Sequence, residues 1–95
     1  MYVPLKRAVI AALYNYEEAT FSQIVSFITN IYENTNLLVD YYDEEEIQVI
    51  LGTMSLLGYV KNGNGKYSLL KEKVSEKYFK NFISPILNAF NTSRG

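Results

Sequence analysis

The sequence predicts a mainly α-helical domain with one small β-hairpin, an α+β fold class. Apolar residues recur every three or four positions in four segments, which is the period of an amphipathic helix. Between the third and fourth segments, "NGNG" separates two short apolar runs, and Asn-Gly pairs favour the turn of a hairpin. With 95 residues, 48% of them hydrophobic, the chain is expected to form one domain around one core.

The first two helices are bounded by residues that favour helix starts and stops. Pro4 suits the first turn of a helix, and the apolar residues after it predict a helix to about Tyr16. "EEAT" ends this pattern, and Thr20 or Ser22 can cap a second helix, which "ENTN" ends. The "LLVDYY" run that follows is expected to be a connection that buries part of its apolar surface.

A third helix is expected to begin at Asp43, its N-cap, with Glu44 to Glu46 in its first turn. Anions there meet the positive end of the helix dipole, and each contributes roughly 0.3–1 kcal/mol. Gly58 is well placed for the left-handed residue that ends a helix. The inward stripe of this helix is expected to be Ile47, Ile50, Leu51, Met54 and Leu57.

The C-terminal third contains the hairpin and a last helical segment. "YVK" and "KYSLL" are the two strands, and two overlapping Asn-Gly pairs leave the register open. Pro85 either kinks the last helix or, with Ser84, starts a second short one, and "NTSRG" is expected to fray. The domain therefore divides into a core over residues 4–70 and a C-terminal helical segment over 71–91. The C-terminal segment carries an apolar stripe at helical spacing that is larger than a three-helix core needs for its cover. This excess predicts a homodimer interface, formed by Tyr78, Phe79, Phe82, Ile83, Ile86, Leu87 and Phe90.

The composition excludes several kinds of chemistry. The chain has no cysteine and no histidine, which rules out disulfides, thiolate nucleophiles, Cys/His zinc sites and histidine acid–base catalysis. We therefore expect no enzyme activity, no cofactor and no metal site. The nearly uncharged run from Ile47 to Val60 is too short to span a bilayer, and the first residues do not resemble a signal peptide. A cytoplasmic protein without membrane contact is expected.

Charge is divided along the chain, although its net value is only −1. Residues 8–60 hold eight carboxylates and no lysine or arginine, whereas residues 61–95 hold seven cations against Glu72 and Glu76. Lysines 71, 73, 77 and 80 either follow a phosphate backbone or form the solvated side of an amphipathic helix. The acidic run from Asp43 to Glu46 is interpreted as a helix cap and not as a cation site, because consecutive carboxylates on a helix do not converge on one point.

The element order resembles a winged helix-turn-helix domain over about residues 5–70. The residues that carry the resemblance are Thr20 to Ile24 at the start of the second helix, then Leu51, Met54, Gly58, Tyr59 and Val60, and then Gly63 to Tyr67 as the wing. The C-terminal helix is similar to that of small dimeric regulators of the MarR and PadR kinds. Richness in tyrosine, isoleucine and asparagine without cysteine resembles small proteins of thermophilic archaea and their viruses, and for a viral protein the expected location is the host cytoplasm.

The resemblance implies sequence-specific binding of double-stranded DNA, with the third helix in the major groove and the wing along the backbone. Gln48 would then pair with adenine and Thr53 would touch a thymine methyl. The expected phosphate contacts are Lys61, Asn62, Asn64 and Lys66 on the wing, with Lys6 and Arg7 near the N-terminus. The carboxylates at the start of the third helix oppose phosphate binding.

Two functions are therefore open. The first is a dimeric transcriptional regulator that binds DNA through the wing and flanking cations. The alternative is a winged-helix module for protein–protein interaction, in which the acidic third helix docks on a basic partner through Val49, Leu56 and the run from Asp43 to Glu46. The two exposed aliphatics are equally compatible with an ordinary surface.

Overall fold

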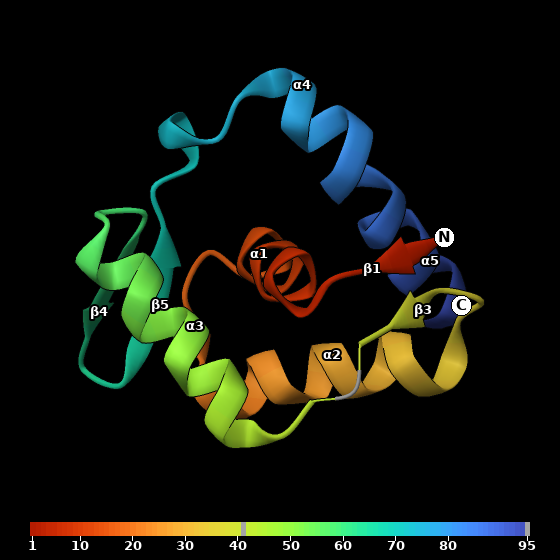
Figure 1. The fold of residues 1–95 in the computed structure, drawn as a ribbon, viewed down its shortest axis with the longest axis horizontal. Helices are drawn as coiled ribbons and strands as arrows, with labels where there is room; N and C mark the ends of the chain where they lie inside the picture. Colours follow the sequence, from red (N-terminus) through yellow and green to blue (C-terminus); the bar gives the residue numbers. More distant parts are fainter. Residues whose placement is uncertain (41, 95) are drawn as a thin grey trace.

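The computed structural model describes residues 1–40 and 42–94, and one helix, α1 (Leu5–Asn15), lies at its centre. Figure 1 shows α1 almost end-on, with α2 (Phe21–Asn34) on one side, α3 (Glu44–Leu56) on another and the C-terminal helices on a third. Because α1 is apolar nearly all round, it can be covered on several sides at once. Its buried residues are Leu5, Ala8, Val9, Ile10, Ala11, Ala12 and Leu13.

Helix α2 begins with a reciprocal cap that fixes its start. The Gln23 N–H donates to Thr20 Oγ1 at 3.1 Å, and the Thr20 N–H donates to Gln23 Oε1 at 2.9 Å. This capping box satisfies two backbone donors that would otherwise lack partners. Of the two caps that the sequence allows, Thr20 is the one that the structure uses.

A three-stranded antiparallel sheet lies beside the helices, in the order β2-β5-β4. Its strands are β2 (Ala19–Thr20), β4 (Val60–Gly63) and β5 (Lys66–Leu69). Gly63 pairs with Lys66, and the two turn residues Asn64 and Gly65 have φ of 55° and 74°. Positive φ at both positions is the type I′ hairpin, so the second Asn-Gly pair makes the turn.

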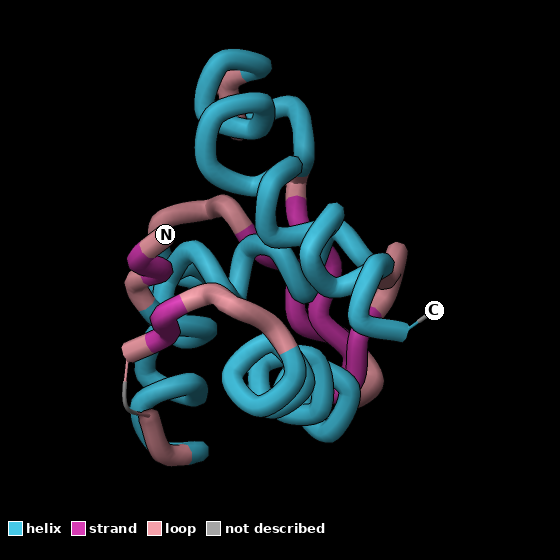
Figure 2. The backbone as a smooth tube through the Cα atoms, turned by 90° about the vertical axis from the view of Figure 1, so that its right-hand side faces the viewer, coloured by secondary structure: helices cyan, strands magenta, loops and turns pink. Residues whose placement is uncertain are grey.

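A second, two-stranded sheet was not predicted from the sequence. Strand β1 (Tyr2–Val3) pairs in parallel with β3 (Leu38–Val39), and Figure 2 shows the two strands as short magenta segments near the N-terminus. Two residues are too few to produce an alternating pattern. The expectation that "LLVDYY" buries its apolar run holds only in part, because Leu38 is 68% exposed while Val39 packs against the core.

The C-terminal segment is helical from Glu76 to Arg94, after the 3₁₀ turn η1 (Lys71–Lys73). It consists of α4 (Glu76–Tyr78), a π-helical stretch η2 (Phe79–Ile83) and α5 (Ser84–Arg94). A proline lacks the backbone N–H and crowds the carbonyl one turn earlier, and the wider π turns before Pro85 accommodate it without ending the helix. The expectation of a frayed "NTSRG" is wrong for residues 91–94, which are helical and where the Ser93 hydroxyl donates to Asn30 Oδ1 at 2.9 Å; Gly95 lies outside the described residues.

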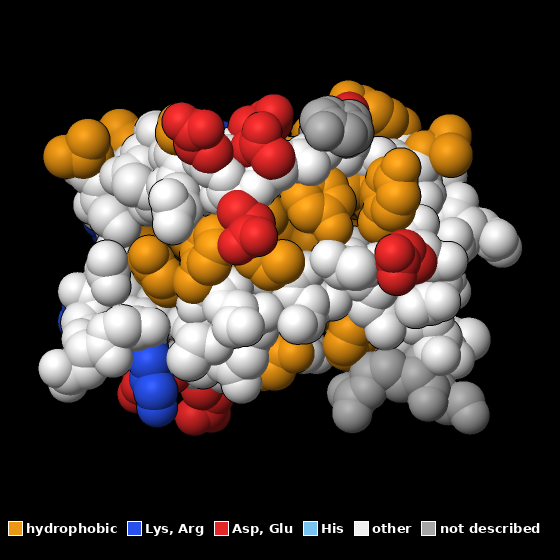
Figure 3. Space-filling view, turned by 90° about the horizontal axis from the view of Figure 1, so that it is seen from below, with side chains coloured by type: hydrophobic (Ala, Val, Ile, Leu, Met, Phe, Trp, Pro, Cys, Tyr) orange, Lys and Arg blue, Asp and Glu red, His pale blue; other side chains and the backbone are white. Residues whose placement is uncertain are grey.

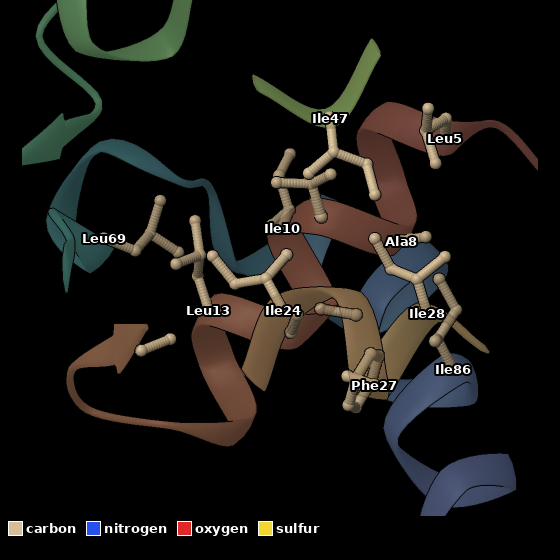
Figure 4. Close-up of a cluster of buried hydrophobic side chains, with 14 of the residues drawn as sticks. Leu5, Ala8, Ile10, Leu13, Ile24, Phe27, Ile28, Ile47, Leu69 and Ile86 are labelled. Atoms are coloured by element: carbon tan, nitrogen blue, oxygen red, sulfur yellow. The ribbon is translucent and has the colours of Figure 1, made fainter. Parts of the chain in front are cut away.

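The C-terminal apolar stripe covers the core of its own chain. Ile83, Ile86 and Phe90 are buried, and the ring of Phe90 stacks on Phe27 with centroids 4.3 Å apart. The sequence-based assignment of these three residues to a dimer interface is wrong, because η2 packs on α1 and α5 packs on α1 and α2 (Figure 4, where Ile86 faces Phe27 and Ile28). The other four candidates either pack against the same core or contact it at its edge: Tyr78, Phe79, Leu87 and Phe82. The residues 71–91 therefore belong to the same core as 4–70, and the homodimer stays a prediction.

Removing the ring of Phe90 is expected to destabilise the folded chain. Phe90→Ala leaves a cavity against Phe27 and should lower the free energy of unfolding by about 3–5 kcal/mol, measured by urea denaturation with circular dichroism. Phe90→Leu should lower it less, and Phe82→Ala, at a partly exposed ring, should also have a smaller effect. Equal losses for Phe82→Ala and Phe90→Ala would contradict this assignment of the core.

Candidate binding groove along helix α3

Helix α3 is held at both ends by the residues that the sequence predicts. The Glu46 N–H donates to Asp43 Oδ1 at 2.8 Å, so Asp43 is the N-cap, and Glu44 to Glu46 occupy the first turn. Gly58 has φ of +82°, which is the left-handed conformation that reverses the chain after a helix. Both predictions are confirmed.

The outward face of α3 carries large aliphatic side chains. Inward, Ile47, Leu51 and Met54 are buried, and Ile50 is partly buried. Outward, Val49 is 62% exposed and Leu56 is 90% exposed. Leu57 was expected to point inward, but it is 63% exposed, because it is the C-cap at which the chain leaves the helix.

A groove of about 520 Å³ runs beside this face, between α3, α1 and the segment from β5 to α4. Its floor is apolar and comes from three different elements, with the buried side chains Ile10, Met54 and Leu69. Two lysines, Lys6 on α1 and Lys73 on η1, also line it. The remaining lining residues are Val49, Ile50, Thr53, Leu57, Tyr59, Val74, Ser75 and Tyr78.

A second, shallower hollow of about 380 Å³ continues the groove toward the start of α3. It shares Val49 and Ile50 with the first and is otherwise lined by carboxylates, those of Asp43, Glu45 and Glu46. Figure 3 shows carboxylates and hydrophobic side chains intermixed on the face seen from below, which is the side where α2 and the start of α3 lie. The two hollows together extend along the whole of α3.

The two ends of the groove carry opposite charges. The carboxylates lie at the N-terminal end of α3, whereas Lys73 lies at its C-terminal end, with its Nζ 5.9 Å from the ring centroid of Tyr59. A Cβ on Gly58 would come within 3.1 Å of the same Nζ, so Lys73 lies directly against the helix terminus. Each charge has the sign that the α3 dipole favours at that end.

The residues predicted to contact DNA are not gathered at this groove. Lys6 and Thr53 line it, whereas Gln48 is exposed without lining either hollow. The Arg7 guanidinium lies 4.0 Å from the ring centroid of Phe82, a cation–π contact that occupies it within the chain. The four wing residues are exposed on the hairpin, away from both hollows: Lys61, Asn62, Asn64 and Lys66.

Sequence reasoning missed Lys73, Tyr59 and Leu57 as groove residues. In the sequence Lys73 belongs to a row of lysines that suggests a solvated helix face, and nothing local indicates that η1 returns to the end of α3. The hydrogen bond from the Leu70 N–H to the Tyr59 carbonyl, at 2.8 Å, holds the two segments together. This bond continues the β4–β5 pairing beyond Val60 and Leu69, and it brings the chain that leads to Lys73 back to the end of α3.

Among the tyrosines that the structure describes, Tyr2 and Tyr14 have displaced pKa values, and neither lines the groove. The hydrogen bond that the Tyr2 hydroxyl donates to the Asp40 carboxylate raises the pKa of Tyr2. Partial burial raises the pKa of Tyr14, whose ring lies 4.7 Å from that of Phe79. Within residues 1–40 and 42–94, the acidic side chains form no group of three or more that could hold a metal ion.

No family model, curated protein or solved structure was found to match this chain. In the described part of the chain, every helix is too short or too polar to cross a bilayer.

Removing the cap of α3 is expected to loosen the wall of the groove. Asp43→Ala should lower the free energy of unfolding by about 0.5–2 kcal/mol, because the Glu46 N–H loses its acceptor. Asp43→Asn keeps an acceptor oxygen and should retain most of that stability in the same urea titration. If Asp43→Asn lowers the free energy of unfolding as much as Asp43→Ala does, loss of the cap is not the cause of the destabilisation.

Proposed function

We propose that this chain is a winged-helix domain that binds another protein through α3 and the adjoining groove. The observation that carries the proposal is the row of exposed aliphatics on α3 beside an apolar groove, on a helix that has three carboxylates in its first turn and no cation. An exposed apolar patch next to a preformed depression is typical of a protein–protein contact site.

The winged-helix part of the proposal is supported by the order of the elements. Helix α1, strand β2, helices α2 and α3 and the hairpin β4–β5 follow one another in the order of that fold, and β2 pairs with β5. Helix α3 then occupies the position of a recognition helix, and the type I′ hairpin that of the wing. The proposed protein contact would use the helix that the winged-helix resemblance places in the major groove of DNA.

Energetics favour a protein over DNA as the ligand of α3. Burial of an exposed valine or leucine side chain contributes up to about 1.5–3 kcal/mol, and α3 with its C-cap offers Val49, Leu56 and Leu57. A DNA duplex at α3 would bring phosphates close to the carboxylates from Asp43 to Glu46, and these like charges repel each other. Most non-specific DNA affinity comes from the opposite effect, the attraction between phosphates and cationic side chains. A partner with apolar and basic side chains satisfies both features.

A selection from a random peptide library displayed on phage tests the proposal. Peptides enriched on the unmodified protein should lose binding at least tenfold to Val49→Glu, because a carboxylate then lies at the junction of the two hollows. The control Glu17→Lys changes an exposed residue outside both hollows and should bind the same peptides equally well. If no peptide is enriched, or if the enriched peptides bind Val49→Glu unchanged, the proposal fails.

A second candidate function is DNA binding through the hairpin, and it is supported by one specific observation. Lys61, Asn62, Asn64 and Lys66 are all exposed on the β4–β5 hairpin, at the position of a wing. Transcription regulation by DNA binding would then depend on this hairpin and on Lys6, with the acidic start of α3 turned away from the duplex. The carboxylates from Asp43 to Glu46 would favour this orientation, because phosphates repel them.

A titration with a random-sequence duplex distinguishes this second candidate. If Lys6, Lys61 and Lys66 each meet one phosphate, log affinity should fall with log salt at a slope of about −3, and Lys61→Ala with Lys66→Ala should reduce the slope to about −1. The control pair Lys77→Ala and Lys80→Ala, on the C-terminal helices, should leave the slope unchanged. Absence of binding at about 50 mM salt and high micromolar protein would exclude DNA, since non-specific binding is commonly 10⁻⁴–10⁻⁶ M.

A further inference from the structure

We infer that the partner segment is an amphipathic α-helix of about three turns, which lies antiparallel to α3 with acidic residues in its first turn and basic residues in its last. This inference rests on the proposed function and specifies the class of partner. Three observations carry it: the length of the groove, the apolar character of its floor, and the opposite charges at its ends.

The length of the groove matches a helix. The α3 residues that line the two hollows recur every three or four positions, from Glu45 and Glu46 through Val49 and Thr53 to Leu57. They therefore form one continuous stripe along the side of α3, and at 1.5 Å per residue it is roughly 18 Å long. A partner helix of about 12 residues extends the same distance, whereas a small molecule would fill only one of the hollows.

The floor of the groove accepts an apolar stripe from such a helix. Ile10, Met54 and Leu69 are buried at the bottom, and the partly exposed Leu57 and Tyr59 line the same depression. Helices that bind in grooves of this kind present apolar anchors at positions i, i+3, i+4 and i+7. Such a helix would bury the aliphatic surface of α3 that is exposed in the single chain.

The charges around the groove set the polarity of the partner. Asp43, Glu45 and Glu46 lie at one end and Lys73 lies at the other, so complementary side chains must be basic at the first end and acidic at the second. Lys6 adds a second cation on the α1 wall. Charge complementarity of this kind decides the register and the direction of a docked helix more than its affinity.

The direction follows from the dipole of the partner helix itself. A helix is more stable with acidic residues in its first turn and basic residues in its last. When its basic last turn faces the carboxylates at the start of α3, it runs antiparallel to α3. A parallel helix would need basic residues in its first turn, where they oppose its own dipole.

The probe is a synthetic 14-residue peptide with leucines at i, i+3, i+4 and i+7, glutamates in its first turn and lysines in its last. It should bind the unmodified protein in fluorescence anisotropy, and a peptide of the same composition with the leucine spacing scrambled should not. Glu45→Lys with Glu46→Lys should weaken the probe about two- to fivefold for each charge, the effect of an exposed ion pair. Glu17→Lys with Glu18→Lys is the matched control and should leave the affinity unchanged.

Direction is measured with a nitroxide on either end of the probe and ¹⁵N-labelled protein. A label at the peptide C-terminus should broaden the amide signals of residues 43–47, and a label at its N-terminus those of residues 57–59 and 73. The reverse pattern overturns the antiparallel arrangement, and equal affinity for the scrambled peptide overturns the helix. If library peptides bind α3 while the probe does not bind at millimolar concentration, this inference fails and the proposed function stands; if the library also yields nothing, both fail.

Discussion

The burial of α1 around most of its circumference is the constraint from which the rest of the structure follows. A helix with buried residues around most of its circumference must be covered by several elements, and α2, α3, η2, α5 and β5 all contact it. Its three alanines allow this, since small side chains let neighbouring backbones approach closely. Each covering element needs only a narrow apolar stripe, so the outer faces of α3 and of the hairpin are free to carry polar, charged or exposed apolar residues.

The sequence predicted those parts of the fold that depend on neighbouring residues. Asp43 and Thr20 cap their helices because a side-chain oxygen reaches a backbone N–H three positions on, which is visible in a short window. Gly58 and the second Asn-Gly pair adopt positive φ for an equally local reason. The mainly helical α+β class follows from the same periodicities.

Features that depend on distant partners could not be predicted in this way. The C-terminal apolar stripe has the same appearance whether it covers another chain or α1 and α2, and the packing of Phe90 on Phe27 and the burial of Ile83 and Ile86 distinguish the two. Parallel pairing of β1 with β3 joins residues 36 positions apart in strands of two residues. The candidate groove is of the same kind: its acidic end was visible as a run in the sequence, whereas its basic end comes from Lys73, which the fold brings to the end of α3.

The narrow attachment of α3 has a consequence for how this surface can evolve. Ile47, Leu51 and Met54 hold the helix, while positions 45, 48, 49, 52, 53 and 56 are exposed, and the space around Gly52 is open. Mutations at these six positions remove no core contact, so selection on them is nearly independent of selection for folding. On α1, where most positions are buried, almost every mutation changes a core contact and therefore the stability of the fold. A lineage that keeps α1 fixed can therefore acquire a new specificity on α3 through a few substitutions, each of which leaves the folded scaffold intact.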